Sequence, residues 1–167
     1  MTATYDCIAT TTLGSTQSSV TFSTISGSYT DLVLVIQGDF DADGDVRFRI
    51  NSDTGSNYSF THLWGDGSTA GSVRTSNATS GSGDYYGNIT TTLGNSVQIF
   101  QFMNYANTTT YKTVISRANQ AGGGVDATVN LWRSTSAITS LSFARNSGFG
   151  GTWQIGSTFT LYGIKAE

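Results

Sequence analysis

The chain has 167 residues, a formal net charge of −3 at pH 7 and 11% charged residues, less than half of the ~25% typical of soluble proteins. This length fits one domain that can bury a core without disulfides or a metal. The eight basic residues are scattered along the chain, so no basic stripe indicates nucleic-acid binding. Cys7 is the single cysteine, which excludes an internal disulfide.

The first residues of the chain lack the charged and apolar regions of a secretory signal. No apolar run approaches the ~20 residues that span a bilayer, so no membrane partner is expected. Ser, Thr, Gly and Asn fill most polar positions, as is common in particle-forming and secreted β-proteins. We therefore expect a protein made in a cytoplasm.

Taken in chain order, alternating and β-branched segments predict a series of short strands. These segments are 5–13, 20–25, 32–36, 46–50, 58–64, 85–92, 96–105, 111–117, 125–133, 138–144 and 158–165. In 125–133, Val125, Ala127, Val129 and Leu131 share one face of the strand. No helical window lies between the segments, so the strands are expected to pair antiparallel.

The stretch from Leu32 to Ile50 carries the clearest fold signal. Segment 32–36 is a continuous apolar run, which predicts a strand buried on both faces. Segment 46–50 alternates apolar residues with two arginines, which predicts one packed and one solvated face. The pair Asp43-Gly44 lies between them and predicts that the two strands form a hairpin. A buried strand beside a half-exposed one requires a second layer to cover it.

Two connecting segments also carry expectations. In the polar segment 51–57, Gly55 is expected to adopt a positive φ angle. Segment 65–83 is rich in Gly, Ser and Thr and is weakly patterned, which predicts a long loop. Loops of this length in compact domains are usually functional or disordered.

These elements predict an all-β fold: an antiparallel two-sheet β-sandwich, jelly-roll-like, with about eight to ten strands. We expect a single domain over residues 1–167. Residues 1–4 are expected to form a flexible N-terminal arm.

Enzymatic motifs are absent from the sequence. His62 is the only histidine, and its place on a strand predicts a half-buried structural residue. The sequence contains neither a nucleophile elbow nor a phosphate-binding P-loop. We expect a protein that is not an enzyme, with no catalytic residues.

The aspartates at 39–45 are the candidate metal site. Asp39, Asp41 and Asp43, followed by Gly44, reproduce the opening of a Ca²⁺-binding loop. The match ends at the twelfth position, where Ile50 replaces the bidentate glutamate. The alternative is a solvated acidic tip without a cofactor, and the chain pattern favours this alternative.

Aromatic residues near strand ends are candidates for stacking on sugars or for contacting a partner. The candidates near predicted strand ends or loops are Trp64, Tyr85, Tyr86, Trp132 and Trp153. Of these we select Trp64, Tyr85 and Tyr86, with the segment after Trp64 as the first place to look. The alternative is that these strand-end aromatics cap the sandwich core.

Four segments have a distinctive sequence: YTDLVL at 29–34, FRINSDTGSNYS at 48–59, LWRSTSAITS at 131–140 and, most distinctively, GSTFTLYGIK at 156–165. In these segments the chain resembles a family of small virion structural proteins of tailed bacteriophages. The resemblance implies a place in the virion and carries no catalytic motif. The aspartates at 39–45 are not part of the pattern.

From the resemblance we expect a non-enzymatic bacteriophage virion protein that is made in the host cytoplasm. The first expectation is a capsid decoration or cement protein that binds the major capsid protein and stabilises the head lattice. A homo-oligomer, a homotrimer in particular, is expected because closed symmetry buries exposed sheet edges. The alternative is a tail-fibre or receptor-binding module for host surface glycans. A free carbohydrate-binding module is the third hypothesis.

Overall fold

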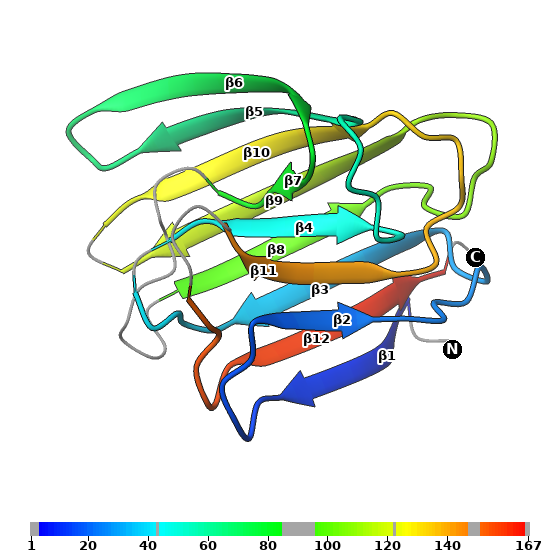
Figure 1. Cartoon of the computed structure of the whole chain (residues 1–167), viewed down its shortest axis with the longest axis horizontal. Helices are drawn as coiled ribbons and strands as arrows, with labels where there is room; N and C mark the ends of the chain where they lie inside the picture. The colour runs from blue at the N-terminus through cyan, green and yellow to red at the C-terminus, as the bar shows by residue number, and fades with distance from the viewer. Residues whose placement is uncertain (1–3, 43, 85–95, 122, 147–150, 166–167) are drawn as a thin grey trace.

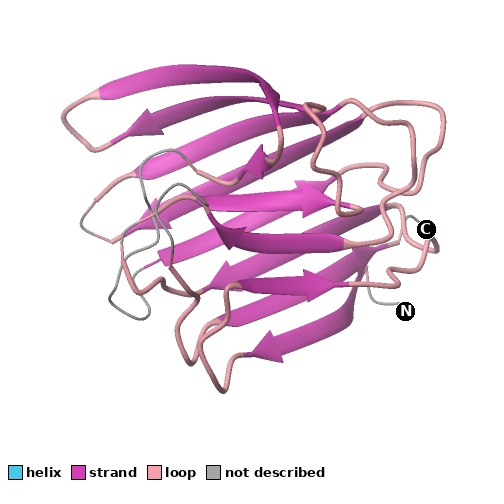
Figure 2. Cartoon of the chain, in the orientation of Figure 1, coloured by secondary structure: helices cyan, strands magenta, loops and turns pink. Residues whose placement is uncertain are grey.

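The computed structural model describes residues 4–42, 44–84, 96–121, 123–146 and 151–165. These residues form twelve β-strands and no helix (Figure 2). The strands are β1 (Tyr5–Thr12), β2 (Ser19–Phe22), β3 (Asp31–Gln37), β4 (Val46–Ile50), β5 (Tyr58–Gly65), β6 (Ala70–Ala78), β7 (Gly81–Ser82), β8 (Ser96–Phe102), β9 (Lys112–Gln120), β10 (Val125–Trp132), β11 (Leu141–Arg145) and β12 (Thr158–Ile164). The predicted strand at 85–92 lies outside the described residues.

The strands form two stacked antiparallel sheets. The larger sheet has eight strands in the order β1-β12-β3-β8-β9-β10-β5-β6, and the smaller has four in the order β2-β11-β4-β7. Figure 1 shows the smaller sheet in front of the larger one, with β5 and β6 extending beyond its upper edge. The predicted all-β, antiparallel, jelly-roll-like sandwich is confirmed. The predicted strand number is too low, because twelve strands are found in the described residues alone.

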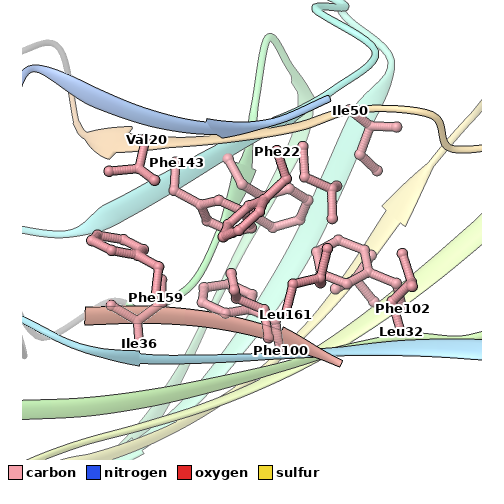
Figure 3. Packing of buried hydrophobic residues seen from close by; sticks show 14 of the residues in the cluster. Val20, Phe22, Leu32, Ile36, Ile50, Phe100, Phe102, Phe143, Phe159 and Leu161 are labelled. Carbon is pink, nitrogen blue, oxygen red and sulfur yellow. The ribbon is translucent and has the colours of Figure 1, made fainter. Parts of the chain in front are cut away.

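The core lies between the two sheets because strand alternation turns apolar side chains from both layers toward each other. Figure 3 shows these side chains meeting between the layers. Phe48 of the smaller sheet lies at the centre, with its ring 5.7 Å from those of both Phe100 and Phe102 of the larger sheet. The edge-to-face geometry of these pairs adds to the burial of their apolar area.

The predicted hairpin at Leu32–Ile50 is wrong, although both of its strands exist. β3 pairs with β12 and β8 in the larger sheet, whereas β4 pairs with β11 and β7 in the smaller one. Segment 38–45 therefore crosses from one layer to the other. The apolar face of β4 packs against the larger sheet from the opposite layer, where Phe48 meets Phe100. A turn signal between two strands does not say whether they join the same sheet, so the chain pattern was compatible with either arrangement.

The predicted loop at 65–83 is also wrong, because it contains β6 and β7. β6 forms the edge of the larger sheet and pairs with β5. Its side chains alternate between exposed and partly buried positions, and Val73 is the one large apolar residue among them. A strand with two largely polar faces gives no hydrophobic alternation, which is why the sequence did not reveal it.

The turn after β4 uses other residues than the glycine expected. Asn51 and Ser52 have positive φ angles of 52° and 58°, whereas Gly55 is not among the positive-φ residues. A Cβ at Gly55 would lie 2.8 Å from Nδ2 of Asn57, so a larger residue there would displace the Asn57 side chain. The Asn51 side chain stabilises its own turn by accepting hydrogen bonds from the backbone N–H groups of Thr139 and Ser140 at 2.8 and 3.1 Å.

Candidate functional site

Strand β10 points its polar side chains into the sandwich and its apolar side chains into solvent. Asp126, Thr128 and Asn130 face inward and are 5%, 0% and 1% exposed. Val125 and Val129 face outward and are 60% and 50% exposed. This is the reverse of the usual orientation of a half-buried strand.

The neighbouring strands share part of this orientation. His62 of β5, Gln98 of β8 and Ser116 of β9 are buried on the inner side, on the same faces as apolar side chains such as Phe60 and Phe100. Leu63 of β5 is 57% exposed on the outer side, and Ile115 of β9 is 37% exposed. We call the outward set the outer apolar patch; it comprises Leu63, Val97, Ile99, Ile115, Val125, Ala127 and Val129.

The strand register makes this patch continuous. Ala127 lies opposite Leu63 on one side and Arg117 on the other, and Arg117 lies opposite Ile99. In the next row, Val129 lies opposite Ile115. Side chains directly opposite on one face are in contact distance, so the patch is a single surface across four strands.

The outer face is hollowed along β10. A shallow groove of about 640 Å³ is lined by outward residues of β5, β8, β9 and β10, among them Leu63, Ile99 and Val125. A second hollow of about 440 Å³ is lined by Val129 and Leu131 and by Arg74 of β6. Arg117 is the one charged residue that points outward from β5, β8, β9 and β10, and Asp126 also lines the first hollow. The two hollows therefore combine apolar contact with two arginines and one carboxylate at their margins.

The inward polar residues of the same strands hold β7 in place. Asn130 binds the Ser82 backbone through both atoms of its amide, and Ser116 Oγ donates to the Gly83 carbonyl at 2.8 Å. Asp84 Oδ1 accepts from the Val46 N–H at 2.7 Å. Asn130 and Ser116 thus satisfy backbone groups of β7 and of the residue that follows it, and Asp84 satisfies the backbone of β4.

His62 belongs to this inner layer and is 1% exposed, deeper than the half-buried position expected. Its Nδ1 lies 2.8 Å from Thr128 Oγ1, and its ring packs against Phe60 at 5.0 Å. Burial, and secondarily the charge of Arg47, lower the pKa of His62 to about 4. The imidazole is therefore neutral at pH 7 and turned away from the surface, as its predicted structural role requires.

The predicted metal ligands at 39–45 have separate environments. Asp39 is 1% exposed, so the expectation of a solvated acidic tip is wrong for this residue. The reason is that it lies where the chain passes from the larger to the smaller sheet, and its backbone N–H donates to Ser157 Oγ. Asp41 is exposed and accepts from the Thr152 N–H at 3.1 Å, and Asp43 lies outside the described residues. Within the part of the chain that the structure describes, no three His, Cys, Asp or Glu side chains gather around a metal position. Calcium binding stays a prediction.

The predicted sugar-contacting aromatics are only partly described. Trp64 is partly buried near the end of β5, with its indole over Gly71 of β6. Tyr85 and Tyr86 lie outside the described residues, so their role stays a prediction. Trp132 and Trp153 are 3% and 0% exposed, as expected for aromatics that cap or fill the core. Sequence reasoning did not select the outer apolar patch as a candidate site, although the shared face of 125–133 was its signal.

The chain was compared with known families, curated proteins and solved structures. No family model and no curated protein matches it. The galectin LEC-6 of Caenorhabditis elegans matches with a TM-score of 0.39 and 11% identity, over 94% of this chain and 96% of the galectin. A mutant of the alginate lyase Aly36B in complex with an alginate tetrasaccharide matches with a TM-score of 0.28 and 9% identity, over 83% of this chain and 72% of the lyase. At these values neither likeness says what this chain binds.

Among the residues that the structure describes, no helix has the length and hydropathy to cross a bilayer.

Proposed function

We propose that this chain is a non-enzymatic structural subunit of a bacteriophage virion, namely a decoration protein that binds and stabilises the capsid lattice. The observation that carries the proposal is the outer apolar patch. Four neighbouring strands present aliphatic side chains to solvent while their polar side chains stabilise the interior. Contiguous exposed apolar surface of this kind marks a protein contact site.

The buried polar groups support an assembly role over a chemical one. Asn130, Ser116 and Asp84 each hydrogen-bond backbone of the β7 region or of β4, so these side chains stabilise the sandwich. His62 is buried and neutral beside Thr128. A general acid or base must reach the proton that it transfers, and an imidazole enclosed by two sheets does not meet a substrate in solution.

The contact chemistry suits a particle that must persist outside the cell. The outward strand faces rely on aliphatic and hydroxyl groups, and only 11% of the chain is charged. Such contacts are less sensitive to salt than contacts between exposed charges. Together with the resemblance of four segments to virion proteins, this favours the capsid surface as the place of the chain. The proposed partners are the major capsid protein and further copies of the chain, arranged as a trimer.

The test is to locate the protein on intact particles. Antibodies raised against the purified chain, detected with gold in negative-stain electron microscopy, are expected to label phage heads uniformly. Particles from which the gene has been deleted serve as the control. The heads of particles without the gene should also break open at a lower temperature than wild-type heads, since a decoration protein contributes contacts across the lattice.

Two outcomes contradict the proposal. Label confined to tails overturns the decoration role and favours the receptor-binding alternative, which a glycan array then examines directly. Absence of label from particles that do contain the gene overturns a place in the virion.

A further inference from the structure

We infer that the outer apolar patch is covered by another copy of this chain, so that the protein is a closed homo-oligomer held together through the outer face of its larger sheet. This inference rests on the assembly role proposed above and specifies which surface and which partner produce it. It does not depend on where in the virion the protein lies.

The size of the face fits a protein–protein interface. Six neighbouring strands, from β3 to β6, spaced by ~4.8 Å and each about seven residues long at ~3.3 Å per residue, cover about 670 Å² before side-chain relief is counted, and the four strands of the patch cover about 440 Å² of it. A stable interface buries ~800 Å² per partner. The patch therefore has the size of the apolar centre of such an interface, with side-chain relief and the flanking strands β3 and β6 supplying the rest of the contact area.

The edges of the larger sheet are poorly suited to self-association. β1 has a bulge between Cys7 and Ala9 where it pairs with β12. β6 has one opposite Tyr58 and Phe60, close to Asn77 with its positive φ of 56°. Bulges in edge strands interrupt the hydrogen-bonding row that another strand would use. Copies are thus directed away from edge pairing and toward the face.

The smaller sheet does not offer an equivalent surface. Its outward positions carry Arg47, Arg49, Thr21 and Ser142, and a hollow there is lined by arginine and hydroxyl side chains. Association driven by apolar burial is therefore expected on the larger sheet.

The charges around the patch allow two copies to pack face to face without bringing their Arg117 side chains together. β5 and β10 have no outward charge of their own, and Arg74 of the edge strand β6 lies at their margin, opposite Thr61; the half formed by β9 and β8 carries Arg117. When the half formed by β5 and β10 in one copy packs on the Arg117 half of the next, the Arg117 stem lies along aliphatic side chains such as Leu63, and the two Arg117 side chains do not meet. Both a twofold and a threefold arrangement can place the halves in this way.

The experiment is a mass measurement by light scattering on the full chain at micromolar concentration. The wild type is expected at two or three times 17.7 kDa, with three corresponding to the proposed trimer. Val129→Lys places a charge in the centre of the patch and should weaken association by about a hundredfold or more, which gives a monomer. Ser19→Lys, at an exposed position on β2 of the smaller sheet, is the matched control and should keep the wild-type mass.

A second variant distinguishes loss of association from loss of the fold. Leu63→Thr combined with Val129→Thr places β-branched strand formers at both positions and removes apolar contact area. It should have the wild-type circular dichroism and a shifted monomer–oligomer equilibrium. A wild type that is monomeric at ~100 µM, or patch variants that keep the wild-type mass, overturns the inference. If antibodies label the heads but light scattering gives a monomer, this inference is wrong and the proposed virion function stands. If light scattering gives an oligomer but no particle is labelled, the proposed virion function is wrong and this inference stands.

Discussion

Asn130 on β10 binds the backbone of Ser82 on β7 as a neighbouring strand would. Its Oδ1 accepts from the Ser82 N–H at 2.8 Å, and its Nδ2 donates to the Ser82 carbonyl at 2.9 Å. Both residues are buried, at 1% and 0% exposed. One amide side chain therefore connects a two-residue strand of the smaller sheet to the centre of the larger sheet.

Asn130→Ala should lower the free energy of unfolding by about 3 kcal/mol, because it leaves a buried N–H and a buried carbonyl of Ser82 unsatisfied. Guanidinium denaturation followed by tryptophan fluorescence measures this change. Asn119→Ala, at an exposed position on β9, is the control and should change the free energy by less than about 0.5 kcal/mol. Equal effects of the two variants would show that the hydrogen bonds of the Asn130 amide contribute nothing to stability.

The buried His62 predicts that stability falls as the solution is acidified. The unfolded imidazole takes up a proton below about pH 6.5, whereas in the folded chain the pKa is lowered to about 4. Stability is therefore full above pH 6.5 and is lost progressively down to about pH 4, by up to about 3 kcal/mol. The measurement is the free energy of unfolding at half-unit pH steps.

His62→Gln provides the control for this titration. The amide stays neutral at every pH and can still pair with the Thr128 hydroxyl. Since His62 is the only histidine, the variant should have little pH dependence between 6.5 and 4. A wild-type slope that persists in the variant would assign the effect to other groups.

The strands were largely predictable from the sequence, but their partners were not. Segment 46–50 has the predicted packed and solvated faces, and the inner face of 32–36 is fully buried. Alternation reports which residues share a face and contains no information about which strand lies alongside. The acidic segment between them therefore suggested a tight hairpin, whereas it crosses between layers.

The candidate site was predictable only in part, because alternation again shows which residues share a face and not what that face contacts. The sequence shows that Val125 and Val129 share a face, but a period of two does not say whether that face points inward. The direction is decided by the partners of the opposite face, where Asn130 and Thr128 meet β7 and the Gly83 carbonyl. Those contacts join distant parts of the chain and are invisible to a local pattern.

Gln98 is predicted to be a position where a polar side chain lowers stability. It is fully buried on β8, and neither atom of its amide has a hydrogen-bond partner in the described ranges. Gln98→Met keeps the length and flexibility of the side chain without the amide, so the free energy of unfolding should rise by about 1 kcal/mol. Gln101→Met, on the outward side of the same strand, is the control and should have a smaller effect. Loss of stability in Gln98→Met would mean that an ordered water or another group satisfies the amide.

Trp132 is predicted to control the acidity of Asp53. Burial favours the neutral acid, but hydrogen bonds from the Trp132 indole, the Asn57 amide and the Gly55 N–H outweigh it and hold the pKa of Asp53 below its ordinary 3.8. The indole Nε1 lies 2.7 Å from Asp53 Oδ2. Trp132→Phe removes this donor and should raise the pKa of Asp53 in the folded chain, with a loss of about 2 kcal/mol at pH 7.

The sign follows from the depressed folded pKa. The stabilisation by ionised Asp53 is present above the unfolded pKa of 3.8 and is lost as the pH falls through the lower folded value, so this acid-dependent loss should shrink in Trp132→Phe. Carbon-detected NMR titration of the Asp53 carboxyl measures the pKa directly. Trp153→Phe is the matched control, because its indole donates to the Phe143 carbonyl at 3.2 Å: it should destabilise the fold and leave the pKa of Asp53 unchanged. An unchanged Asp53 pKa in Trp132→Phe would mean that the other donors suffice.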